Sequence, residues 1–401
     1  MTGSPGHASQ ISLLAVFGPK PTNPRLRICA DGLLMSRVNR SDPMKRRNFL
    51  RMMGGAATAT ATTTIGIDRL FADFTPTENI TSRVAGLPRR HLGRTKLEVS
   101  IITFPGLALM HENQEQSNVV VKRAFDRGLN YFDVAPAYGR DGECEIKLGH
   151  ALQQLRRQDY VLSCKTKLRD KEGARVELER SLERLKTDHF DLYQLHHLVT
   201  AEDIKRAFGP GGAMETLVAA RKEGKAKWLG FSAHSTRAAV DAMRAFDFDT
   251  VMFPISFAEY YLRDFGRQVL EVAAERGAAV IAIKPLCMGA WPKGVERTRN
   301  WWYRTTETPE EIGLALRFSL SLKNVITGIP PSFVDLVDKS ITAANSFQAA
   351  TSADHDQLRD LARKCESVFL REDELGANST ASHHRSPYPD HPQECGLEAW
   401  V

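Results

Sequence analysis

The sequence predicts an α/β protein built as a (β/α)8 TIM barrel, with an N-terminal hairpin before the barrel and an extra C-terminal helix after it. Short apolar runs alternate with amphipathic helical stretches over residues 90–345, the pattern of repeated strand–helix units. Eight such units fit into this span, whose length is typical of such barrels. The first run ends in Phe104–Leu107 without the Gly-x-Gly-x-x-Gly fingerprint of a doubly wound open sheet.

The elements follow from the local pattern, taken along the chain. Residues 90–104 predict a hairpin that turns at Gly93 and leads into the first strand. Residues 174–186 carry apolar side chains on one helical face and charges on the other, and other connections show the same pattern. After the barrel, residues 354–370 predict one more helix, and the polar tail from Arg371 is predicted to be irregular. The strands are expected to begin near Ile101, Asn130, Tyr160, His189, Ala226, Thr250, Ala278 and Asn324.

Composition excludes several classes of protein. The chain is 42% hydrophobic and 25% charged, as in soluble globular proteins, and has no run of about 20 apolar residues that would indicate a polytopic membrane protein. The first 67 residues hold nine basic and two acidic residues, whereas the remaining 334 hold 45 basic and 46 acidic. A nearly neutral body is not expected to bind nucleic acid. The six cysteines form no Cys-x-x-Cys pair, so no metal site is predicted.

The basic residues near the N-terminus belong to a segment that looks like a targeting signal. The Arg46-Arg47 pair is followed by a Phe-Leu pair and a weakly apolar, Thr-rich run that is too short for a membrane helix. This order resembles a twin-arginine export signal. We expect residues 44–80 to be signal and linker, and translation to start at Met44, so that residues 1–43 are not translated or are disordered. The resemblance implies export to the periplasm or cell envelope; without it, a cytoplasmic location is expected.

Four polar residues stand at the ends of three consecutive predicted strands. Asp133 ends the second strand and Tyr138 follows it, Lys165 ends the third, and His196 ends the fourth. Each alone has an ordinary structural explanation, such as a helix cap, packing or a solvated strand end. Together they lie where (β/α)8 barrels carry their chemistry, so we expect them to form a catalytic site. Lys167 is the alternative to the lysine and His197 the alternative to the histidine.

From about residue 90 to 345 the sequence resembles the aldo/keto reductase family. Residues 130–139 match the motif of its second strand, residues 191–196 that of its fourth, and residues 229–234 the cofactor segment of its fifth. The resemblance implies a barrel of residues 88–347 that binds a nicotinamide cofactor without a Rossmann domain. Residues 348–401 would then be a C-terminal helix and tail.

The resemblance also implies a role for each of the four residues. Tyr138 would be the general acid that protonates the alkoxide left by hydride transfer. A free phenol, with a pKa of about 10, is a reluctant donor, and Lys165 would favour its phenolate. Asp133 would keep Lys165 charged and in place. His196 would donate a hydrogen bond to the carbonyl oxygen.

In the cofactor contacts that the resemblance implies, this chain departs from the family's pattern at two places. Many relatives have a tyrosine that stacks on the nicotinamide where this chain has Lys284. Relatives that prefer NADPH carry a basic residue soon after the glycine of the last strand, where this chain has Pro-Pro-Ser, with Lys339 as a substitute. NADP(H) is expected over NAD(H), although the choice stays open. The implied contacts are Ser232, His234, Lys284, Pro285, Leu286, Gly328, Ser332 and Lys339.

These features predict an NAD(P)H-dependent carbonyl reductase for small aldehydes, ketones or sugar-like substrates. The alternative is a cofactor-binding regulatory module of the same fold with little turnover. A metal-dependent barrel hydrolase would need His/Asp clusters at several strand ends and is not supported. The expected partners are a small carbonyl substrate and the twin-arginine export machinery, and the oligomeric state stays open. The loops expected to frame the pocket include Trp291, Trp301, Trp302 and Tyr303.

Overall fold

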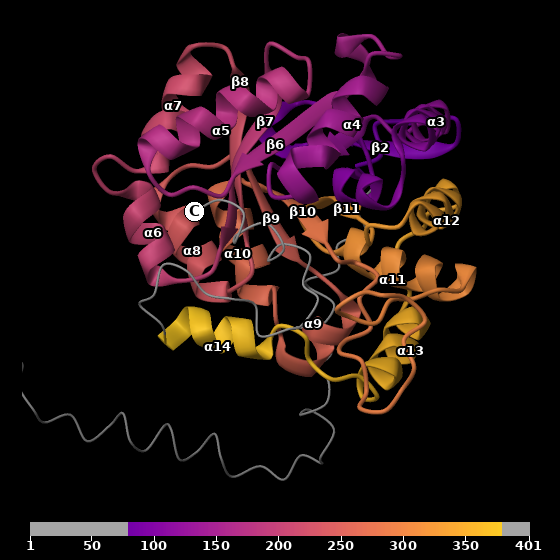
Figure 1. Cartoon of the computed structure of the whole chain (residues 1–401). Helices are drawn as coiled ribbons and strands as arrows, with labels where there is room; N and C mark the ends of the chain where they lie inside the picture. The colour runs from indigo at the N-terminus through magenta and orange to yellow at the C-terminus, as the bar shows by residue number, and fades with distance from the viewer. Residues whose placement is uncertain (1–78, 379–401) are drawn as a thin grey trace, which may run out of the picture. The chain divides into compact units, whose positions relative to one another are not determined.

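The computed structural model describes residues 79–378, which are coloured in Figure 1. The arginine pair of the predicted signal, the whole of residues 1–43 and the tail residues 379–401 lie outside the described part. Among the described residues, no helix combines the length and the apolar character needed to cross a bilayer.

Eight parallel strands form a single sheet in which β4 to β11 are neighbours in chain order. Its two edge strands also meet, because Ile102 bridges Gly328 in parallel and the N–H of Thr103 donates to the Gly328 carbonyl at 2.9 Å. The sheet is therefore closed, which confirms the predicted (β/α)8 fold. The strands are β4 Phe104–Pro105, β5 Tyr131–Asp133, β6 Val161–Thr166, β7 Phe190–Leu198, β8 Ala226–Ala233, β9 Thr250–Pro254, β10 Ala279–Ile283 and β11 Val325–Ile329.

Helices surround the strands (Figure 1). Two helices, rather than one, follow β7 and β9. Several helices begin at a capping box, in which the side chain before the helix and the side chain three residues later satisfy each other's free N–H groups. Asn113, Thr200, Thr308 and Thr351 are the capping residues. The helices are α3 Gln114–Asp126, α4 Glu143–Leu152, α5 Lys171–Arg184, α6 Ala201–Phe208, α7 Ala213–Lys222, α8 Thr236–Ala245, α9 Phe257–Arg263, α10 Arg267–Arg276, α11 Pro309–Ser321, α12 Val334–Asn345, α13 Ser352–Ala362 and α14 Leu370–Asn378.

A small antiparallel sheet precedes the barrel. Strands β2 (Leu87–His91) and β3 (Glu98–Ser100) form the predicted hairpin, and β1 (Ser82–Val84) adds a third strand that the sequence pattern did not indicate. Leu92, just after β2, and Val99 of β3 pack into the barrel interior, in one cluster with inward-facing strand residues such as Val161 and Ile281. Because Val161 begins its strand, the hairpin covers the amino ends of the strands and leaves the site to the carboxyl ends.

The extra helix after the barrel is present, but its predicted end is wrong. α13 stops at Ala362, and a second helix, α14, starts at Leu370 in the tail that was expected to be irregular. Glu259 of α9 fixes the place where α14 begins. Its carboxylate accepts the backbone N–H groups of Val368, at 2.5 Å, and Phe369, at 3.3 Å. These buried N–H groups, directly before the first residue of α14, are thus satisfied by a side chain.

Candidate active site

The four residues predicted to be catalytic come from three neighbouring strands. Asp133 is the last residue of β5, Lys165 lies in β6 and His196 in β7, and Tyr138 follows β5 in the connection to α4. β5, β6 and β7 pair in parallel and in order. Their carboxyl ends therefore lie side by side, and the side chains meet at the mouth of the barrel.

Lys165 is the centre of this group. Its Nζ donates to Asp133 Oδ2 at 2.5 Å and lies 3.2 Å from both Tyr138 Oη and the Val134 carbonyl oxygen. The other carboxylate oxygen of Asp133 accepts a hydrogen bond of 2.6 Å from Ser163 Oγ. The Lys165 side chain is fully buried, so its charge depends on these partners. Lys167, the alternative lysine, lies beyond the end of β6.

The surroundings of Lys165 and Tyr138 favour a charged lysine and a protonated phenol. Burial alone would lower the pKa of Lys165, but Asp133 and then Tyr138 raise it above its usual value. Burial raises the pKa of Tyr138 to about 12, with Lys165 acting in the opposite direction. The lysine therefore favours the phenolate as expected, but burial has the larger effect. Near neutral pH the phenol keeps the proton that a general acid must deliver.

His196 is buried beside the phenol. Its ring meets the Tyr138 ring edge-on, with 5.5 Å between the centroids. Burial, followed by the charges of Lys165 and Lys167, holds the pKa of His196 well below its usual value. The imidazole is therefore neutral near physiological pH and can donate one N–H to a carbonyl oxygen.

The end of β7 has a local distortion that brings two histidines to the barrel mouth. His197 has a left-handed backbone, with φ of 59°, and the register with β8 shifts between Leu195 and Leu198. Arg169 supports this turn by donating to the carbonyl oxygens of His196 and His197, at 2.9 and 3.0 Å. The sequence pattern gave no indication of this role of Arg169.

A pocket opens above these residues at the mouth of the barrel. Asp133, Tyr138 and His196 form part of its wall, and Lys165 lies beneath them. Four of the predicted cofactor residues line it: Ser232, His234, Lys284 and Ser332. Trp301, Trp302 and Tyr303 of the loop between β10 and α11 line it as well.

The other predicted cofactor residues, and Trp291, do not line this pocket. Pro285 and Leu286 are buried behind Lys284, and Gly328 makes the backbone hydrogen bonds that close the barrel. Lys339 forms an ion pair with Asp335, with 3.4 Å between Nζ and Oδ2. Trp291 supports the wall from outside by donating its indole N–H to the Trp301 carbonyl at 2.7 Å.

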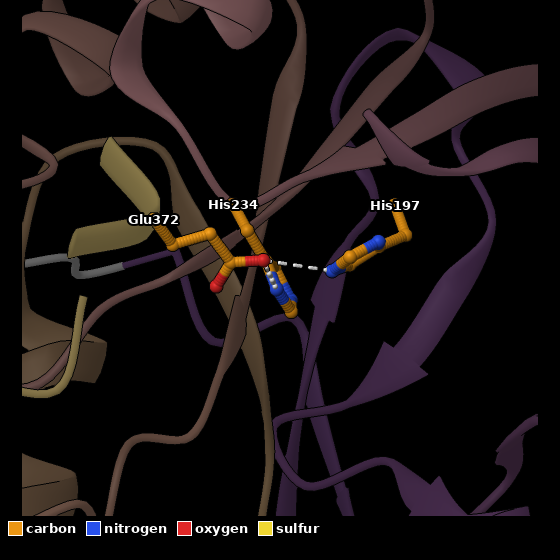
Figure 2. A group of neighbouring side chains, drawn as sticks. All are labelled: His197, His234 and Glu372. Atoms are coloured by element: carbon orange, nitrogen blue, oxygen red, sulfur yellow. Dashed lines mark hydrogen bonds and ion pairs between the residues drawn. The ribbon is translucent and has the colours of Figure 1, made fainter. Parts of the chain in front are cut away.

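One residue beside the pocket was not predicted. Glu372 of α14 is fully buried, and its Oε1 lies 3.0 Å from His197 Nε2 and 3.3 Å from His234 Nδ1 (Figure 2). The second nitrogen of His234, Nε2, lies 3.1 Å from Lys284 Nζ. No sequence signal marked Glu372, because it stands in a polar segment 175 residues from His197.

A (β/α)8 barrel with a phenol, an ammonium, a carboxylate and an imidazole at the carboxyl ends of its strands has the groups that an oxidoreductase of carbonyl compounds requires. The model of the aldo/keto reductase family matches residues 106–345, more than half of the chain. The chain belongs to the aldo/keto reductase family.

The individual relatives share only about a quarter to a third of their residues with this chain, over about half of its length. L-galactose dehydrogenase of Arabidopsis thaliana is 30% identical over 217 residues, which are 50% of this chain and 66% of that protein. D-threo-aldose 1-dehydrogenase of a Pseudomonas species is 26% identical over 232 residues, which are 50% of this chain and 68% of that protein. Three curated relatives are matched over 59%, 66% and 65% of their length, which is less than two thirds.

The fold is also that of solved aldo-keto reductases. The holo form of an aldo-keto reductase from Bacillus halodurans superimposes with a TM-score of 0.58 at 22% identity, covering 72% of this chain and 99% of that one. At this identity the likeness concerns the fold alone.

Proposed function

We propose that the protein is an NAD(P)H-dependent carbonyl reductase for small aldehydes, ketones or sugar-like substrates. The observation that carries the proposal is the hydrogen-bonded chain from Asp133 through Lys165 to Tyr138 at the wall of the pocket. Two relatives are named as dehydrogenases of sugars, L-galactose dehydrogenase and D-threo-aldose 1-dehydrogenase, which supports sugar-like substrates.

The residues of the pocket fit a nicotinamide group. The hydroxyls of Ser232 and Ser332 on its wall offer polar contacts to a carboxamide. Ser232 Oγ already accepts the backbone N–H of His197 at 2.8 Å, so its own hydrogen can be donated. A bound reduced nicotinamide would supply the hydride.

The protein's own groups then handle the charge that develops on the carbonyl oxygen. His196 donates its N–H to that oxygen, which stabilises the negative charge. Tyr138 gives its proton to the same oxygen, and the Lys165 ammonium 3.2 Å away stabilises the phenolate that results. Asp133 keeps Lys165 charged throughout. Proton delivery is assigned to Tyr138 rather than to His196, because burial and the nearby lysines hold the His196 imidazole neutral.

NADP(H) is proposed over NAD(H). Arg299 and Lys339 stand together around Asp335 at the beginning of α12, with Arg299 Nη2 2.6 Å from Asp335 Oδ2 and Lys339 Nζ 3.4 Å from the same atom. Glu307 also pairs with Arg299, at 2.8 Å, so the four charges balance, and a bound 2′-phosphate would take the place of one of these carboxylates as the partner of Lys339 or Arg299.

The test is oxidation of NADPH and NADH by the purified protein with a panel of aldehydes, ketones and aldoses, followed by the absorbance of the reduced cofactor. We expect carbonyl-dependent oxidation, with a lower KM for NADPH. Cofactor binding without turnover of any carbonyl would contradict the reductase and favour a regulatory module. A lower KM for NADH would contradict only the cofactor preference.

Export through the twin-arginine route is proposed as well, and the Arg46-Arg47 pair carries this proposal. Replacing both arginines by lysine keeps the charge but removes the pair. We expect the double variant to stay in the cytoplasmic fraction of a bacterial host while the natural sequence reaches the periplasm. Equal distribution of the two, measured by fractionation and immunoblot, would contradict the export signal.

A further inference from the structure

Lys284 places an ammonium group in the wall of the pocket. The residue follows β10 directly and has a left-handed backbone, with φ of 58°. Its Nζ lies 5.6 Å from the centre of the Trp302 ring and 5.5 Å from that of Phe369. Two aromatic faces therefore hold the charge by cation–π attraction, and Lys284 itself lines the pocket with Tyr138 and His196.

A chain of hydrogen bonds fixes the position of this ammonium. Because an ammonium can only donate, Lys284 donates to His234 Nε2, at 3.1 Å. The hydrogen of the neutral His234 ring is then on Nδ1, which donates to Glu372 Oε1 at 3.3 Å. His197 Nε2 donates to the same oxygen at 3.0 Å (Figure 2). The Glu372 carboxylate thus serves as the counter-charge of the Lys284 ammonium, with the His234 imidazole hydrogen-bonded between them.

The same three side chains resemble the ligand set of a metal site. His197, His234 and Glu372 bring two imidazoles and one carboxylate within 4.8 Å, a set that zinc accepts. In this arrangement, however, both nitrogens facing Glu372 act as donors, and the Lys284 ammonium is 3.1 Å from His234. A divalent cation would have to displace both hydrogens and lie close to a like charge. The geometry therefore favours a network that holds Lys284 in place.

We propose that Lys284 binds a carboxylate group of the carbonyl substrate, so that the protein prefers oxo acids or sugar acids over neutral carbonyl compounds. This inference rests on the proposed reductase function and adds the class of substrate. The contact with His234 uses one of the three ammonium hydrogens. Bringing a carboxylate to a desolvated ammonium gives a charge-assisted hydrogen bond, which is about twice as strong as a neutral one.

The protonation state of Lys284 is consistent with this role. Burial lowers its pKa to about 8, against the opposing effect of Glu372 on α14. His234 at the end of β8, Cys287 beyond β10 and Lys165 in β6 are other titratable groups around it. The ammonium form dominates at neutral pH and is lost as the pH rises through about 8. The preference for acids should fall over the same range, while turnover of neutral carbonyls should not follow this profile.

The experiment compares matched acid and neutral substrates, succinic semialdehyde with butanal and glucuronate with glucose. The measured quantity is the ratio of kcat/KM for the acid to that for the neutral compound. Lys284→Met should lower the ratio by about tenfold to about a hundredfold, the effect of losing one hydrogen bond between charged groups. Lys284→Arg should keep most of the preference, and Glu372→Gln should reduce it in part. Lys293→Met, in an exposed part of the loop between β10 and α11, is the matched control and should match the wild type.

Two results would overturn the inference. An unchanged ratio in Lys284→Met would show that the ammonium does not select the substrate. An unchanged ratio with a raised KM for NADPH would assign Lys284 to the cofactor's phosphates instead. If no carbonyl compound is turned over, calorimetric titration with butanoate and butanamide decides the point separately. A preference for butanoate over butanamide that is lost in Lys284→Met supports the anion site even where the reductase proposal fails. The absence of such a preference, together with the absence of turnover, overturns the anion site as well as the reductase proposal.

Discussion

Replacing Tyr138 with Phe should lower kcat by about 10²–10⁴-fold, the usual contribution of a positioned general acid. The substitution removes only the hydroxyl group that lies 3.2 Å from Lys165. The ring that faces His196 edge-on stays, as does the cation–π contact of Lys165, whose Nζ is 4.9 Å from the ring centre. The affinity for NADPH, measured by fluorescence titration, should therefore change little.

A matched control separates loss of the proton donor from loss of a buried hydroxyl. Tyr160→Phe removes a hydroxyl from another buried tyrosine, just before β6, which packs against Phe132 and does not line the pocket. This variant should keep the wild-type kcat. If Tyr138→Phe retained full activity in steady-state and single-turnover assays, Tyr138 would not be the acid.

Replacing Asp133 with Asn should lower the free energy of unfolding by about 3–5 kcal/mol, because removal of one partner leaves the other charge of a buried pair uncompensated. Lys165 is fully buried, and the Asp133 carboxylate is its counter-ion. Asn keeps the shape of the side chain but not the charge. Denaturation with urea, followed by fluorescence, measures the change. We also expect kcat to fall, because an unpaired lysine in this place would lose its proton.

Ser163→Ala provides the comparison for Asp133→Asn. It removes the 2.6 Å hydrogen bond to the other carboxylate oxygen but leaves the ion pair, so it should cost only about 1 kcal/mol. Should Asp133→Asn fail to fold, the double variant Asp133→Asn with Lys165→Met removes both charges and should recover much of the stability. Similar unfolding free energies for Asp133→Asn and Ser163→Ala would contradict the importance of the pair.

The barrel and the meeting of the four candidate catalytic residues at its mouth could be predicted because both depend on short-range patterns. A strand is recognised from a few apolar residues, and each observed barrel strand begins within a few residues of its expected place. Once the strands are placed, the barrel geometry requires Asp133, Lys165 and His196 to share one end. Closure of the barrel through Gly328 and the hairpin under it follow from the same regular structure.

The remaining features depend on partners that are distant in the sequence. The start of α14 is fixed by Glu259, whose carboxylate satisfies the N–H groups of Val368 and Phe369. The position of the Lys284 ammonium depends on His234 and, through it, on Glu372. Even the sign of the Tyr138 pKa shift depends on the depth of burial, which no local pattern reports.

Glu372 belongs to a helix that lies beyond residue 345, where the match to the family model ends. Lys284, the proposed contact for the substrate carboxylate, lies inside that match, whereas a side chain that positions it lies outside. Changes in the segment after α13 should therefore adjust the preference that Lys284 sets and leave the groups proposed for hydride transfer untouched. In evolution, such a division lets a terminal segment tune the choice of substrate without any change in the barrel.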